Sequence, residues 1–112
     1  MPKGMFKSRL LRERLEPTTP LLSLDEVKAK LQVATDVDDI TELLWMLRKK
    51  RSQIDPAFLL PIMASKEASN REDVALTLPY IRHPESKRML QLLANDEDPD
   101  VSKAAKEGLG KF

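Results

Sequence analysis

The sequence repeats its apolar pattern every 31 residues, and this period restricts the possible folds more than any other feature of the chain. Shifting the C-terminal segment back by 31 residues places Ala105 on Val74, and a second shift places it on Leu43. The turn that precedes this segment has an acidic residue in each repeat, namely Asp36, Glu67 and Asp98. A period of this length is typical of stacked supersecondary units. We therefore expect three repeated units, each a pair of helices.

Helix-start signals and apolar periodicity predict six helices in three hairpins. The expected first helices cover 25–34, 56–65 and 85–94, and the expected second helices cover 37–51, 69–82 and 99–111. Ser23 and Glu26 have the spacing of a capping box. Asp98 followed by Pro99 is a favourable N-cap and first helical residue. Because each hairpin has an apolar stripe too wide to bury alone, the hairpins are expected to stack and share a core.

Two prolines fall inside the expected helices. An interior proline removes a backbone hydrogen bond and clashes with the preceding turn. We therefore expect Pro61 to kink the helix at 56–65 and Pro79 to shorten the helix at 69–82.

The sequence DEDPDVSKAAKEGLGKF at the C-terminus resembles the second helix of a HEAT-like repeat, especially the short repeats of phycobilisome-lyase-type proteins. The matching residues are Asp98, Pro99, Val101, Ala104, Ala105, Leu109 and Gly110. The resemblance covers residues 84–112. It implies an all-α, armadillo-like fold: a short right-handed α-solenoid of about three HEAT-like hairpins.

Charge divides the chain into two expected regions. Residues 1–22 carry five basic and two acidic groups, a net of +3, whereas residues 23–112 carry 14 basic and 16 acidic groups, a net of −2. We expect 1–22 to be a basic N-terminal extension, as a short helix or disordered, and 23–112 to be the repeat domain. Within the extension, Phe6, Leu10, Leu11 and Leu15 have spacing compatible with a short amphipathic helix. Three roles fit it: capping the first repeat, binding a partner groove or touching an anionic surface.

The composition argues against several classes of protein. The chain has no cysteine, which excludes disulfides and thiol catalysis. No apolar run approaches the roughly 18 residues of a membrane-spanning helix, and no secretory signal is recognisable. We therefore expect a cytoplasmic protein without a membrane span.

Catalytic, metal and cofactor sites are not expected. His83 is the only histidine and reads as a solvated loop residue, without a partner to orient it as a general base. The acidic residues at 96–100 lack the glycine and glutamate of a calcium-binding loop, so helix capping explains them better. We expect the protein not to be an enzyme.

Trp45 is the most informative candidate for a binding site. It falls outside the expected buried stripe formed by Ile40, Leu43, Leu44 and Leu47. A shift of 31 residues relates Trp45 to Leu76, so both would lie on one ridge across the second helices. The proposed partner-binding residues are Trp45, Arg48, Lys49, Leu76 and Tyr80. Alternatively, Trp45 packs beneath the N-terminal segment.

These residues predict a protein–protein interaction module, such as an adaptor, scaffold or regulatory subunit, whose partner is another protein. The alternative is nucleic-acid binding through the basic run 48–51 and the N-terminal segment. That alternative requires further cations on the same face, namely Arg71, Arg82, Lys87 and Arg88. The simpler explanation of the basic run is structural: these cations compensate the dipole at the end of the helix.

Overall fold

The computed structural model describes residues 22–50 and 52–112, and every regular element in them is a helix. The expected N-terminal extension lies almost entirely outside the described residues. The elements are α2 (Leu24–Val33), α3 (Val37–Lys50), the 3-10 helix η2 (Pro56–Leu59), α4 (Leu60–Met63), α5 (Ala68–Thr77), the 3-10 helix η3 (Leu78–Tyr80), α6 (Pro84–Leu93) and α7 (Pro99–Leu109). The predicted all-α class is thus confirmed for this part of the chain.

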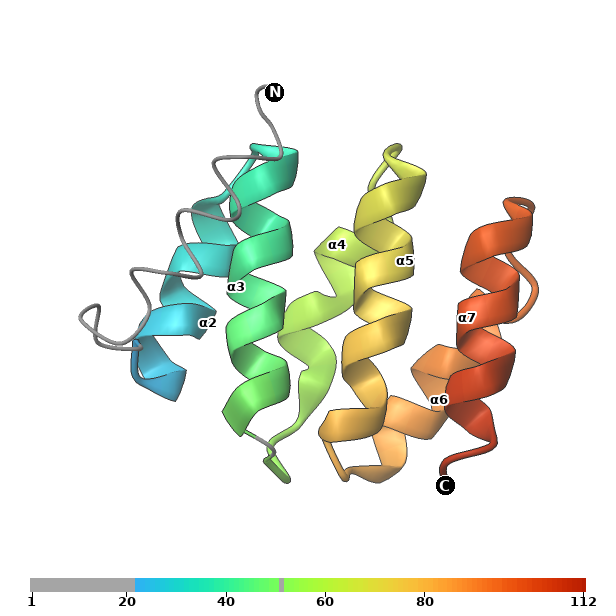
Figure 1. The fold of residues 1–112 in the computed structure, drawn as a ribbon. Coiled ribbons are helices and arrows are strands. Elements are labelled where there is room, and N and C mark those ends of the chain that lie inside the picture. Colours follow the sequence, from blue (N-terminus) through green and yellow to red (C-terminus); the bar gives the residue numbers. More distant parts are fainter. Residues whose placement is uncertain (1–21, 51) are drawn as a thin grey trace.

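The helices pair along the chain as the repeat pattern predicts. α2 packs against α3, α4 against α5, and α6 against α7. The second helices α3, α5 and α7 lie side by side and run in the same direction, with α5 in the middle (Figure 1). In the view of Figure 1, α4 and α6 lie behind this row, and α2 lies beside α3.

Side-chain caps fix the starts of α2 and α7. The capping box at α2 is confirmed: Ser23 N–H donates to Glu26 Oε1 at 2.8 Å, and Glu26 N–H donates to Ser23 Oγ at 3.2 Å. Asp98 caps α7, as predicted, by accepting hydrogen bonds from the backbone of Asp100 and Val101. Asp98 followed by Pro99 therefore makes a sharp start for α7.

Each of the two interior prolines coincides with a change of helix type. The helix expected at 56–65 begins as the 3-10 helix η2 and continues as α4, with Pro61 in the first turn of α4, where the missing N–H costs little. The helix expected at 69–82 ends as an α-helix at Thr77, and Pro79 lies in the 3-10 segment η3. The predicted shortening is confirmed.

The core consists of the apolar stripes of all three hairpins. Its fully buried large side chains include Leu44, Leu47, Leu59, Leu78, Ile81 and Leu90. The predicted stripe on α3 is confirmed, because Ile40, Leu43, Leu44 and Leu47 are all buried. Phe112, the repeat equivalent of the buried Ile81, departs from the pattern: it is 39% exposed and its ring stacks on the Arg82 guanidinium.

Backbone hydrogen bonds join two inter-hairpin connections at the C-terminal end of α3. Ser52 N–H donates to Tyr80 O at 3.1 Å, and Arg82 N–H donates to Ser52 O at 2.8 Å. This isolated parallel bridge is the only β-type pairing in the described residues. It holds the connection after α3 against the connection after η3.

Within residues 22–50 and 52–112, no helix is long and apolar enough to cross a membrane.

Candidate functional site

Asp73 on α5 joins the two helices that carry the predicted site. Thr41 Oγ1 on α3 donates a hydrogen bond of 2.6 Å to Asp73 Oδ2. Arg48 Nη2, also on α3, lies 3.9 Å from Asp73 Oδ1. Both α3 residues are two turns apart on one stripe of the helix. This stripe of α3 is therefore fixed against α5.

Trp45 lies on the same stripe, between Thr41 and Arg48, because residues three and four apart are neighbours on a helix surface. Its side chain is half-buried. Lys49 Nζ lies 4.9 Å from the centroid of the Trp45 ring, a cation–π arrangement. The structure thus brings Trp45 and Lys49 together and places Trp45 beside the junction with α5.

Leu76 follows Asp73 by one turn of α5 and is 39% exposed. Tyr80, in η3, is a further turn along and is half-buried. Val74, Ala75 and Leu78 point into the core instead. We use the name α3–α5 face for Thr41, Trp45, Arg48, Lys49, Asp73, Leu76 and Tyr80.

Sequence reasoning missed Thr41 and Asp73, which hold this face together. Their separation of 32 residues is one more than the repeat period, so a search for polar pairs near that spacing would have found them. The apolar pattern of this helix gives no sign of Asp73, which is polar and half-buried.

The described cations of the basic run, at 48–50, and those expected to enlarge the patch lie in different parts of the fold. Arg48 is half-buried beside Asp73. On α6, Arg88 Nη1 lies 3.5 Å from Glu85 Oε2. Arg82 donates hydrogen bonds to Pro79 O and Lys111 O. Of the two cations predicted for the binding site, Arg48 and Lys49, only Lys49 is exposed.

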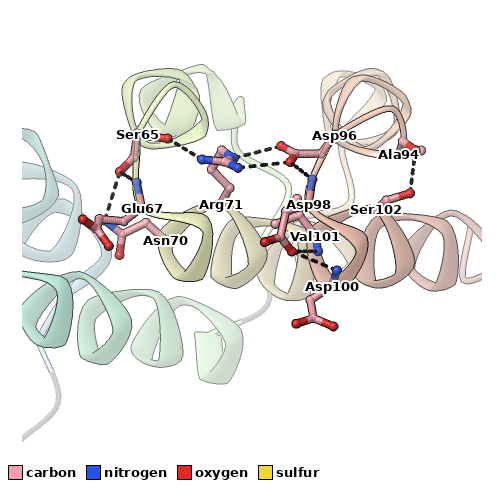
Figure 2. A network of polar contacts seen from close by, with 10 residues as sticks. All are labelled: Ser65, Glu67, Asn70, Arg71, Ala94, Asp96, Asp98, Asp100, Val101 and Ser102. Carbon is pink, nitrogen blue, oxygen red and sulfur yellow. Dashed lines mark hydrogen bonds and ion pairs between the residues drawn. The ribbon is translucent and has the colours of Figure 1, made fainter.

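Arg71 crosses between two turns at the opposite end of α5, as Figure 2 shows. Its Nε and Nη2 donate to the two Asp96 carboxylate oxygens at 2.8 and 3.1 Å, and its Nη1 donates to Ser65 O at 2.8 Å. The hydrogen bond from Arg71 lowers the pKa of Asp96, and the same bond raises the pKa of Arg71. Arg71 therefore links the second hairpin to the third.

Acidic groups gather where α5 lies beside α7. The pKa of Glu72 is raised, first by burial and then by the negative charges of Asp100, Asp73 and Asp98. Burial and nearby carboxylates both disfavour the charged form of Glu72, and the carboxylates place negative charge around it. The α3–α5 face is therefore bordered by negative charge on the α7 side.

His83 is not the solvated loop residue that we expected. It is half-buried and caps α6, because its Nδ1 accepts a hydrogen bond of 3.1 Å from Glu85 N–H. The signal was present in the sequence: a hydrogen-bond acceptor followed by Pro84, as in the Asp98–Pro99 start of α7. A shallow hollow beside it is lined by Arg82, His83, Pro84, Lys87 and Phe112.

The acidic residues at 96–100 act on the protein itself. Asp96 binds Arg71 and the backbone N–H of Asp98, and Asp98 caps α7. Among the described residues, no three acidic or histidine side chains are arranged to hold a metal ion.

No protein-family model matches the chain. Comparisons with curated proteins and with solved structures give no significant match either.

Proposed function

We propose that the chain is a protein–protein interaction module built of HEAT-like repeats, and that it binds another protein through the α3–α5 face. In this proposal the hairpins form a short right-handed α-solenoid, and the protein is a cytoplasmic adaptor, scaffold or regulatory subunit rather than an enzyme. The 31-residue period, the paired helices and the row of second helices support the repeat architecture.

One observation carries the binding proposal: Leu76 stands exposed on the middle helix of the row, one turn from the Asp73 junction and on the same face as Trp45. Large apolar side chains in a cluster point to an interaction surface more strongly than scattered ones. Trp and Tyr are also enriched among the residues that dominate binding energy.

The charges of the face favour a protein over a nucleic acid. Arg48 is half-buried beside Asp73, and Glu72 and Asp100 add negative charge nearby. Phosphate backbones require several exposed cations, and each contact makes binding more sensitive to salt. We expect weak binding of single- or double-stranded nucleic acid at two salt concentrations. A tight, steeply salt-dependent Kd would favour the alternative instead.

A photo-crosslinking amino acid at position 76 tests the protein-binding proposal. We expect it to yield a defined protein adduct in the native cell, identified by mass spectrometry. The matched control carries the crosslinker at Leu92, an apolar side chain on α6 that is 63% exposed. An adduct specific to position 76 that Trp45→Ala abolishes supports the proposal, whereas identical adducts from both positions contradict it.

A further inference from the structure

We propose that the α3–α5 face, with its acidic border, binds the basic stretch 5–15 of the same chain, which an external partner must displace. This inference rests on the proposed function, because it concerns the same face. Residues 1–21 lie outside the described residues, so only their sequence enters here.

The face offers an apolar centre next to negative charge. Leu76 is exposed and Trp45 is half-buried. On the α7 side, Glu72 is half-buried and Asp100 is exposed. Besides burial, the negative charges of Asp100, Asp73 and Asp98 raise the pKa of Glu72, and a cation beside this carboxylate would offset them.

The stretch 5–15 has the complementary pattern. Its apolar residues are Met5, Phe6, Leu10, Leu11 and Leu15, and its cations are Lys7, Arg9, Arg12 and Arg14, against one acidic residue, Glu13. Basic amphipathic segments bind grooves by placing the apolar side chains on an apolar surface and the cations against carboxylates. The rest of the chain has a net charge of −2, so attraction between the two regions is favourable.

The connecting chain is long enough. Six residues, 16–21, separate the stretch from Leu22, which packs against the core ahead of α2. Extended, they span about 20 Å at roughly 3.3 Å per residue. The 14 residues of α3 give a helix of about 21 Å. Because α2 packs against α3, this tether, about as long as α3, starts beside that helix and keeps the local concentration of the stretch high.

Cysteine pairs in the full-length chain test the proposal cleanly, since the natural sequence has no cysteine. The test variant combines Leu10→Cys with Leu76→Cys, and the matched control combines Leu10→Cys with Leu92→Cys. Both are treated with a short bismaleimide and analysed by denaturing gel and mass spectrometry. We expect an intramolecular cross-link in the test variant and none in the control. At about 1 M salt, where the Debye length is about 3 Å, the yield should fall.

A charge swap separates specific binding from simple proximity. Adding Glu72→Lys and Asp100→Lys to the test variant should abolish the cross-link. Adding Lys7→Glu, Arg9→Glu and Arg12→Glu to that variant should restore it. Circular dichroism on each variant checks that the helices remain intact.

Three results overturn the proposal: equal cross-linking in test and control variants, a cross-link that the charge swap leaves unchanged, or cross-linking only between molecules. The last result makes a second copy the occupant. A partner adduct at position 76 without any intramolecular cross-link would leave the proposed function standing and remove only this inference.

Discussion

Asp98 shows how much of the local structure depends on one side chain. Its Oδ1 accepts hydrogen bonds of 2.9 and 3.2 Å from the first turn of α7. We expect Asp98→Ala to lower the free energy of unfolding by about 0.5–2 kcal/mol, the usual cost of a lost N-cap. Urea denaturation measures it. Glu97→Ala, at an exposed neighbouring position, should change the free energy of unfolding by no more than about 0.5 kcal/mol. Equal effects of the two substitutions would show that capping is not the cause.

The ion pair between Arg71 and Asp96 adds to the free energy of unfolding, and this contribution depends on pH. Both side chains are largely buried, 14% and 11% exposed. Because the folded-state pKa of Asp96 lies below its unfolded value of about 3.9, the contribution is complete at neutral pH. It is lost as the pH falls through the folded-state pKa. We expect Asp96→Asn to cost about 1.5–3 kcal/mol at pH 7, the range for hydrogen bonds to charged groups. Urea midpoints of the two proteins should converge in acid, and a constant difference would contradict the assignment.

Glu72 should behave in the opposite way. Its pKa is raised in the folded protein, so its negative charge opposes folding at neutral pH, and this penalty disappears as the pH falls below its unfolded pKa. We expect Glu72→Gln to raise the urea midpoint at pH 7 and to lose this advantage in acid. A lower midpoint at pH 7 would mean that the carboxylate makes a favourable interaction.

Within the helices, two glycines of α7 and its C-cap make a matched pair. A Cβ on Gly108 would lie 3.1 Å from Pro79 Cγ and 3.2 Å from Leu90 Cδ2, whereas a Cβ on Gly110 would meet only Glu107 O, at 3.4 Å. Gly110 has the ordinary right-handed conformation, with φ −66°. We expect Gly110→Ala to stabilise by up to about 1 kcal/mol, through the reduced entropy of the unfolded chain.

At Gly108 the same substitution gains helix propensity but crowds the buried side chains of Pro79 and Leu90, and overpacking costs about 1–3 kcal/mol. We therefore expect Gly108→Ala to lower the thermal midpoint while Gly110→Ala raises it. Stabilisation by both would show that α7 moves away from η3 and α6 at little cost.

Most elements could be predicted from the sequence, because apolar periodicity and helix-start residues are local signals. The start of α3 at Val37 and the range of α7 follow from such signals to within two residues. Pro61 and Pro79 showed where regular helix is disturbed, but the 3-10 geometry of η2 and η3 depends on packing that one segment does not reveal. His83 was misread because histidine is an uncommon cap. The pairing of Arg48 and Thr41 with Asp73 joins different repeats, so no local pattern indicated it.

At the scale of the whole molecule, Trp45 tests whether the α3–α5 face binds or merely packs. The side chain is half-buried, so we expect Trp45→Ala to cost about 1–2 kcal/mol, less than the roughly 3–5 kcal/mol of a buried aromatic. Partner binding should weaken by about 2 kcal/mol or more, as at hot-spot tryptophans. Leu44→Ala, at a fully buried position of the same helix, should cost about 2–5 kcal/mol. Equal losses at both positions would make Trp45 a core residue.

The two ends of α5 are secured by different chemistry. At its N-terminal end, the ion pair between Arg71 and Asp96 joins the second hairpin to the third. At the other end, the Ser52 bridge uses only backbone hydrogen bonds, which do not titrate over any accessible pH. Acid therefore weakens the side-chain contact between the second and third hairpins, whereas the backbone contact between the two connections stays intact.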